Sequence, residues 1–135
     1  MAAALELQKA VFTALGSDVT LTGLLGGARI YDHAPANVSF PYLTFGRASL
    51  RDWGTATEDG NEHLFSIHVW SRAKGRSEAV AIMDTIRQIL HDGALTLAGH
   101  SLINLRRETH EMRFDDDHRV HHGTLQFRAV TEPTG

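Results

Sequence analysis

The chain has 135 residues, of which 42% are hydrophobic and 21% charged, a composition typical of one globular domain with a sizeable core. Its formal net charge is −3, from 13 basic and 16 acidic residues, which argues against a dedicated nucleic-acid binder because phosphate neutralisation needs a surplus of Lys and Arg. The chain lacks cysteine, which excludes disulfides, thiolate zinc sites and cysteine nucleophiles. We find no secretory signal and no apolar stretch near the roughly 20 residues that span a bilayer, so we expect no membrane partner.

The first part of the chain predicts two helices followed by a short strand. Residues 3–15 carry a mostly apolar stripe at helical spacing that includes Leu5 and Phe12. Asp18 is a suitable N-cap for a short second helix, because its carboxylate can accept a bond from a backbone N–H of the first turn. Residues 28–31 then predict a strand.

Two strands joined by a long polar connection are predicted in the middle of the chain. The first covers residues 41–50, and its opening proline is acceptable because that position need not donate to the ladder. The connection covers residues 53–61, and residues 62–71 give the clearest strand of the chain. In this strand two sets of side chains alternate, with Phe65, Ile67 and Val69 on one face and Leu64, Ser66, His68 and Trp70 on the other. We expect the two strands to form an antiparallel pair.

The last third of the chain predicts a long hairpin. Residues 95–97 read as a short strand, and residues 101–113 and 118–130 as the two long strands of the hairpin. Its tip is then the acidic run 115–117, since Asp favours turns. Residues 132–135 are expected to form a loose tail.

A long amphipathic helix is predicted over residues 74–91, where apolar residues recur at helical spacing. It should cover one face of the sheet. The order of elements predicts an α+β fold with a mainly antiparallel sheet, one long amphipathic helix packed on it and an N-terminal helix. We find no internal repeat and no linker, so residues 1–135 are expected to form a single domain.

The nine histidines make a metal or acid–base site the first chemistry to weigh. His110 could open a zincin helix, but the position four residues later is Phe114, where the motif needs a second histidine. Three more histidines, placed on the last predicted strand beside the acidic tip, form a local group of possible ligands: His118, His121 and His122. On a strand the first and last of these share a face. We favour a solvated hairpin, and keep a small metal-dependent enzyme using the His110–His122 region as the alternative.

Other enzyme patterns are incomplete. The glycines at 23, 26 and 27 are not followed by Gly-Lys-Ser/Thr and do not follow a strand, so they form neither a phosphate loop nor a dinucleotide fingerprint. Ser66 and His68 share a strand face, but nothing nearby in sequence orients them as a triad would require. We expect His68 to be buried or interfacial, with a satisfied hydrogen bond. The sequence therefore predicts no catalytic residue and no cofactor.

The remaining polar features are interpreted as contact points with other protein chains. Basic side chains on predicted strands can pair with acidic neighbours of the same chain or of an adjacent subunit, and acidic loop tips can be solvated turns, a patch for a partner or a repulsive lining beside DNA. The candidate interface residues are Trp53, Glu58, Asp59, Arg106, Arg107, Asp115, Asp116 and Asp117.

The order of three segments resembles a known family. The segments are Phe40-Pro41-Tyr42-Leu43-Thr44-Phe45-Gly46, the strand His63–Ser71 ending in Val-Trp-Ser, and a final hairpin strand with His122-Gly123-Thr124-Leu125-Gln126-Phe127-Arg128-Ala129. They resemble the small phage and gene-transfer-agent proteins once grouped as a domain of unknown function and related to the tail terminators of long-tailed phages. The resemblance extends from about Leu5 to Val130.

The resemblance implies a structural virion protein without catalytic residues. Such proteins form a ring, usually a hexamer, that caps the tail tube, stops its polymerisation and offers a docking face to the head connector. The expected partners are further copies of the chain, the major tail tube protein and a connector or stopper protein, with DNA only passing through the channel. The expected location is the head–tail junction of a virion made in the bacterial cytoplasm. A neck or head-completion protein docking to a portal or adaptor ring is the alternative within the same particles.

Overall fold

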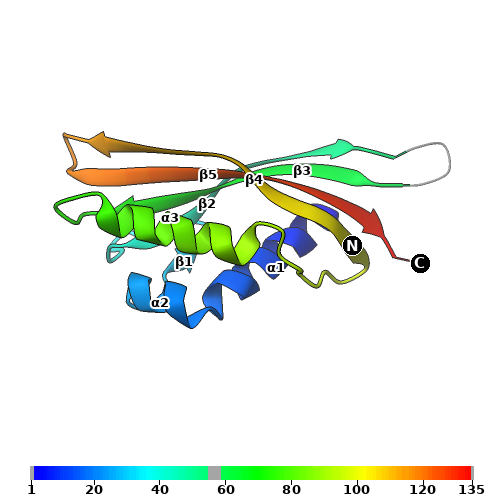
Figure 1. The fold of residues 1–135 in the computed structure, drawn as a ribbon, viewed down its shortest axis with the longest axis horizontal. Coiled ribbons are helices and arrows are strands. Elements are labelled where there is room, and N and C mark those ends of the chain that lie inside the picture. Colours follow the sequence, from blue (N-terminus) through cyan, green and yellow to red (C-terminus); the bar gives the residue numbers. More distant parts are fainter. Residues whose placement is uncertain (1, 55–58, 135) are drawn as a thin grey trace.

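The fold is α+β, as predicted, with helices on one side of a twisted sheet (Figure 1). The computed structural model describes residues 2–54 and 59–134. In chain order the elements are α1 (Ala3–Gly16), α2 (Val19–Leu25), β1 (Ile30–Tyr31), β2 (Tyr42–Asp52), β3 (Asn61–Ser71), α3 (Ser77–Leu90), β4 (His100–Asp115) and β5 (Val120–Pro133). Among the described residues, no helix combines the length and apolar character needed to cross a membrane.

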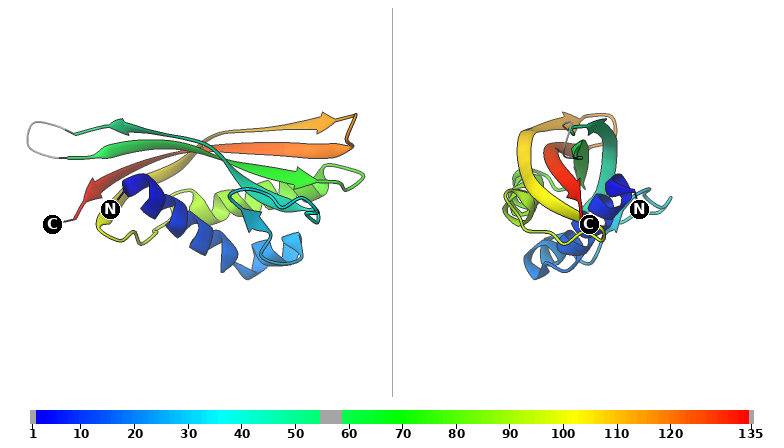
Figure 2. Two further views of the ribbon diagram at one scale, coloured as in Figure 1. Left: turned by 180° about the vertical axis from the view of Figure 1, so that it is seen from behind. Right: turned by 90° about the vertical axis from the view of Figure 1, so that its right-hand side faces the viewer.

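The five strands form one sheet in the order β1-β2-β3-β5-β4. The short β1 pairs with β2 in parallel, and every other neighbouring pair is antiparallel, including the predicted pair of β2 and β3. The β2–β3 and β4–β5 hairpins reach toward opposite ends of the long axis, as Figures 1 and 2 show. The helices all lie on the same side of the sheet, which leaves its other face uncovered.

Helix α2 begins and ends where local capping predicts, but the single long helix is not confirmed. Asp18 caps α2, since its side chain accepts a bond from the backbone N–H of Leu21 at 2.9 Å. Helix α3 has 14 residues, the same length as α1. It ends at Leu90 because the following His91 is extended, and the Nδ1 of that imidazole accepts a bond from the backbone N–H of Arg107 on β4 at 2.9 Å. The chain is thereby drawn from the helix onto the edge of the sheet.

The apolar stripe of α1 differs from the predicted one. Leu7, Val11 and Leu15, spaced four residues apart, are fully buried against the core. Leu5 and Phe12 are instead 51% and 46% exposed. Two large apolar side chains of this helix therefore lie at the surface of the molecule.

The core lies between the three helices and the inner face of the sheet. Its sheet layer follows the predicted alternation in β3, where Ile67 and Val69 are fully buried. Phe127 of β5 is also fully buried, and its ring stacks on that of Phe65 with centroids 5.4 Å apart. The helix layer is made by Leu7, Val11, Leu15, Leu21, Leu25, Ala79, Ile82, Met83, Ile86 and Leu90.

Two predictions near the ends of the last strands are wrong. Residues 95–97 form no strand among the described elements, and Leu97 makes only an isolated bridge with His100. Glu132 and Pro133 of the expected loose tail belong to a strand, because β5 continues to Pro133 opposite His100 of β4. Thr131 is fully buried there and hydrogen-bonds the buried ring of His63 at 2.8 Å.

We predict that Phe127→Ala lowers the free energy of unfolding by about 3–5 kcal/mol, because it leaves a cavity under the helices. Val80→Ala is the matched control, since Val80 is 47% exposed on α3 and its truncation should change stability by less than about 1 kcal/mol. Urea unfolding followed by circular dichroism measures both. Equal losses for the two variants would contradict this assignment of the core.

Candidate interaction surfaces

An aromatic and histidine cluster lies on the uncovered face of the sheet. The register places Tyr42 of β2 and His122 of β5 on either side of Trp70 of β3. The imidazole of His122 stacks on the indole with centroids 3.9 Å apart and an interplanar angle of 6°, and Tyr42 stacks on its other side at 6.1 Å and 17°. Three neighbouring strands thus contribute one ring each to a continuous stack.

Hydrogen bonds fix the orientation of this stack. His68 Nδ1 and His122 Nε2 lie 2.7 Å apart, so one imidazole donates and the other accepts. The Trp70 indole N–H donates to Thr44 Oγ1 at 3.0 Å. Burial lowers the pKa of His68, and burial together with the nearby His68 and Arg113 lowers the pKa of His122. The expected hydrogen bond of His68 is confirmed, and its side chain is half-buried.

A cleft of about 760 Å³ opens beside the stack, toward the β4–β5 tip. Phe40 lies on its wall, and the Arg72 guanidinium sits 4.3 Å above the centre of that ring. Arg113 and the acidic tip also line it. Trp, Tyr and Arg are the residues that most often dominate binding at protein interfaces, and they are gathered here on an uncovered face.

The β4–β5 hairpin carries the acidic run at its tip, as predicted. Asp115 ends β4, and its carboxylate accepts bonds from the backbone N–H groups of Asp117 and His118 at 3.0 and 3.2 Å. The His118 side chain also bonds this carboxylate at 2.9 Å, and this bond is the main cause of the lowered pKa of Asp115. Asp116 and Asp117 point their side chains to solvent in the turn. Asp115 therefore shapes the tip, and the other two aspartates supply its exposed charge.

The histidines near this tip do not converge. His118 lies in the turn rather than on a strand, so the prediction that it shares a strand face with His122 is wrong. His121 packs on Phe114 with ring centroids 4.7 Å apart, on the face opposite to the His122 stack. Within residues 2–54 and 59–134, no group of three or more His, Asp or Glu side chains is placed to hold a metal ion.

The other predicted interface residues lie far from the acidic tip. Trp53 directly follows β2 at the opposite end of the molecule and is 48% exposed, while its backbone N–H donates to the carbonyl of Gly60 at 2.9 Å. Asp59 is exposed at the same end. Glu58 lies outside the described residues. The structure therefore divides the candidates between two ends of the molecule.

The two arginines of β4 lie between these ends, on opposite faces of the edge strand. Arg106 is exposed, with its Nε 3.9 Å from a carboxylate oxygen of Asp92. Arg107 is half-buried, and its backbone N–H holds the His91 ring. The backbone of Arg107 thus joins β4 to the end of α3, whereas the Arg106 side chain is exposed on the opposite face.

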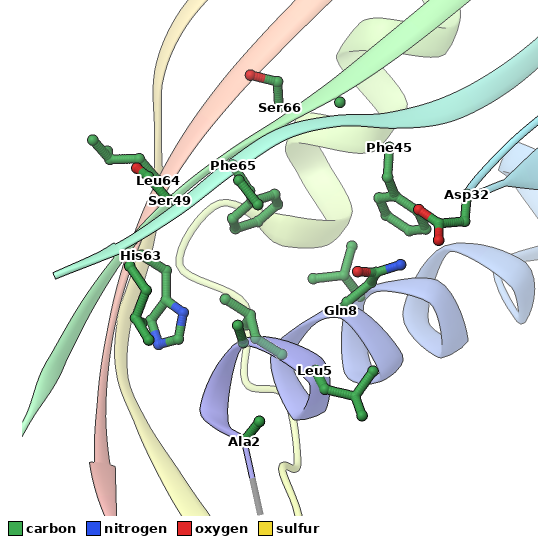
Figure 3. A pocket seen from close by; sticks show the side chains of 16 residues that line it. Ala2, Leu5, Gln8, Asp32, Phe45, Ser49, His63, Leu64, Phe65 and Ser66 are labelled. Carbon is green, nitrogen blue, oxygen red and sulfur yellow. The ribbon is translucent and has the colours of Figure 1, made fainter.

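An apolar groove between α1 and the β2–β3 hairpin was not predicted (Figure 3). It has a volume of about 370 Å³, and its wall includes Leu5 of α1, Phe45 and Leu50 of β2, and Phe65 and the buried His63 of β3. Sequence periodicity assigned Leu5 to the core, so the groove was missed. Leu50 of β2, which also lines the groove, is 50% exposed.

The family model for tail completion protein gp17 matches residues 9–132. The chain belongs to this family. A chain from the virion of a native gene transfer agent particle has the same fold, with a TM-score of 0.88 and 29% identity over 97% of this chain and 98% of that chain. A further solved chain, 9% identical with a TM-score of 0.61 over 100% of this chain and 98% of that one, shares the fold alone.

The comparison with curated proteins gave no match. The family and the virion structure nevertheless assign the tail-completion protein to the structural components of a phage or gene-transfer-agent tail, which confirms the family resemblance seen in the sequence. As a virion-associated protein it works among other virion proteins.

We predict that the His68–His122 pair makes stability depend on pH. The folded protein holds both pKa values below the unfolded value of about 6.5, so the unfolded chain binds more protons as the pH falls through that region. The contribution is present above pH 6.5 and is lost as the pH falls toward the folded pKa. The His122→Gln variant should lose less stability than the unmodified protein between pH 7.5 and 5.5 in urea unfolding.

His33→Gln is the matched control for this prediction, because His33 is exposed in a loop. It should keep the full dependence on pH. The same slope for His122→Gln and the unmodified protein would show that the pair does not govern this dependence.

Proposed function

We propose that this tail-completion protein is a tail terminator: a ring of identical subunits, six in number, that caps the tail tube, stops its polymerisation and joins it to the head connector. The observation that carries this proposal is the match to a chain of a gene transfer agent virion, which spans nearly the whole of both chains at 29% identity. Residues 1–135 act as one domain in this proposal, since the family match leaves only short ends outside it.

A ring suits the surfaces of this chain. Identical subunits close into a ring when two different patches meet head to tail. The chain offers such patches at opposite ends of its long axis, with Trp53 and Asp59 at one end and the Asp115–Asp117 tip at the other (Figure 1). Arg106 lies between them on the edge strand. These residues are proposed to contact neighbouring subunits, the tail tube or the connector.

The protein acts without catalysis in this proposal, and DNA only passes through the ring. Support comes from the family, whose description is structural, and from the net charge of −3. A negative channel does not retain DNA, because like charges repel over the Debye length of roughly 8 Å at physiological salt.

The direct experiment combines purified protein with tail tubes polymerising in vitro. We expect rings at one end of each tube, seen by electron microscopy, and tubes that stop growing once capped. Native mass spectrometry of the released ring should give six copies. Binding to a portal or adaptor ring with no effect on tube growth would show that the protein is a neck protein and not a tail terminator.

We predict that Asp116→Asn with Asp117→Asn weakens capping, because the exposed charge of the β4–β5 tip is removed while Asp115 keeps the turn in shape. The concentration needed to cap half of the tubes should rise about tenfold, a change worth about 1.4 kcal/mol in binding. Asp84→Asn on α3 is the control, since Asp84 is an exposed acid away from both hairpin ends. Unchanged capping by the double variant would show that the charge of the tip does not contribute to the interface.

A further inference from the structure

The sheet has two unpaired edges that fit each other. Strand β1 pairs only with Leu43 and Thr44, so β2 from Ala48 to Asp52 has no neighbour on that side among the described residues. Strand β4 is the other edge. Such edges present rows of N–H and C=O groups that can pair with another chain.

The directions of the two edge strands allow head-to-tail pairing of identical copies. Neighbours from β2 through β3 and β5 to β4 are all antiparallel, so β2 and β4 run in opposite directions. A second copy in the same orientation can therefore lay its β4 antiparallel to β2 of the first. We infer that copies of this chain join by pairing the β2 edge of one with the β4 edge of the next, an inference that rests on the proposed ring.

The part of β4 that fits is its regular second half. Irregularities interrupt β4 between Leu102 and Asn104 and again between Arg107 and Thr109, whereas the stretch from Thr109 to Asp115 is continuous. The helix-side residues of this stretch include Met112 and Phe114, and Phe114 is 43% exposed.

A strand added to the β2 edge extends the wall of the apolar groove. The helix-side residues of β2 here are Ala48 and Leu50, and both line the groove beside α1 (Figure 3). Side chains on the same face of an added strand point to the same side, so Met112 and Phe114 of the second copy would cover Leu50 and the groove. Burial of these exposed apolar groups favours the pairing.

Charge selects one register. With Leu50 opposite Met112, Ala48 faces Phe114, and the polar pairs become Arg51 with Glu111 and Asp52 with His110 of the next copy. A slip by two residues toward the end of β4 places Arg51 opposite Arg113, a repulsive pair. The register with Leu50 opposite Met112 places apolar residues opposite apolar residues and Arg51 opposite an acidic residue.

Arg51 is suited to this role. Its guanidinium lies 3.2 Å from Glu62, but that carboxylate is already bound by Arg128 at 2.7 Å. Two cations therefore share one buried acid, and the Arg51 side chain is 75% exposed. Its remaining donors can bind Glu111 of the next copy.

The pairing staggers the copies. Within one chain Leu50 lies level with Leu105 of β4, through His63 and Ala129. Pairing with Met112 shifts the next copy by seven residues (112 minus 105), roughly 23 Å along the strand. The two patches are different and lie at different ends, which is the head-to-tail type of contact from which rings are built when the rotation between copies closes.

Disulfide trapping tests this pairing, because the chain contains no cysteine. The double variant Leu50→Cys with Met112→Cys is oxidised in rings assembled on tail tubes. Within one chain these residues are three strand spacings (roughly 14 Å) apart across the sheet and seven residues (roughly 23 Å) apart along it, which is too far for a disulfide. We expect covalent chains up to the full ring on denaturing gels.

Register controls are Leu50→Cys with His110→Cys and Leu50→Cys with Phe114→Cys, whose partners are displaced by two residues in either direction. They should cross-link at least fivefold less. Equal or absent cross-linking in all three pairs, with rings still present, would overturn the edge pairing but leave the terminator function intact. Absence of rings from the unmodified protein would overturn both.

A charge exchange gives an independent readout without cysteines. Arg51→Glu alone and Glu111→Arg alone should each raise the protein concentration needed for ring assembly about tenfold. The double variant should recover most of the loss, since the opposite charges face each other again. Additive losses in the double variant would show that the two residues do not meet.

Discussion

Everything in this molecule depends on the burial of one face of the sheet under three helices. Side chains alternate between the two faces along β3 and β5, so burying Ile67, Val69 and Phe127 turns every second side chain to the opposite face. That opposite face holds the Tyr42–Trp70–His122 stack and the Glu62 ion pairs, with no helix above them. One-sided coverage thus creates a rigid platform whose polar face and edges remain for other virion proteins.

The sequence predicted the elements well where local rules decide the outcome. Alternation identified β3, and the Asp18 cap located α2, because both signals act within a few residues. The sequence-based prediction failed where contacts with distant segments determine the extent of an element. The end of α3 depends on His91 bonding Arg107 on a strand, and the length of β5 depends on pairing with the start of β4.

The interaction surfaces were predicted only in part, for a similar reason. The acidic tip follows from the turn propensity of aspartate, and it was found. The aromatic stack could not be predicted, because it depends on the strand register that places His122 beside Trp70, and no local sequence pattern determines that register. The groove could not be predicted either, because it depends on how α1 is rotated about its axis: Leu7 and Val11 are buried and Leu5 is left at the surface. The sequence left a metal site in the His110–His122 region as an alternative, but His121 and His122 occupy opposite faces of β5.

Hydrogen exchange of the free protein and of the assembled ring tests most directly whether the sheet edges join the subunits. Amide groups on exposed edges exchange with solvent, and pairing with a neighbouring strand protects them. The account predicts that residues 48–52 of β2 and 110–114 of β4 gain protection together on assembly, while the interior of β3 remains protected in both states. Rings that assemble with these two edges still exchanging as in the free protein would contradict it.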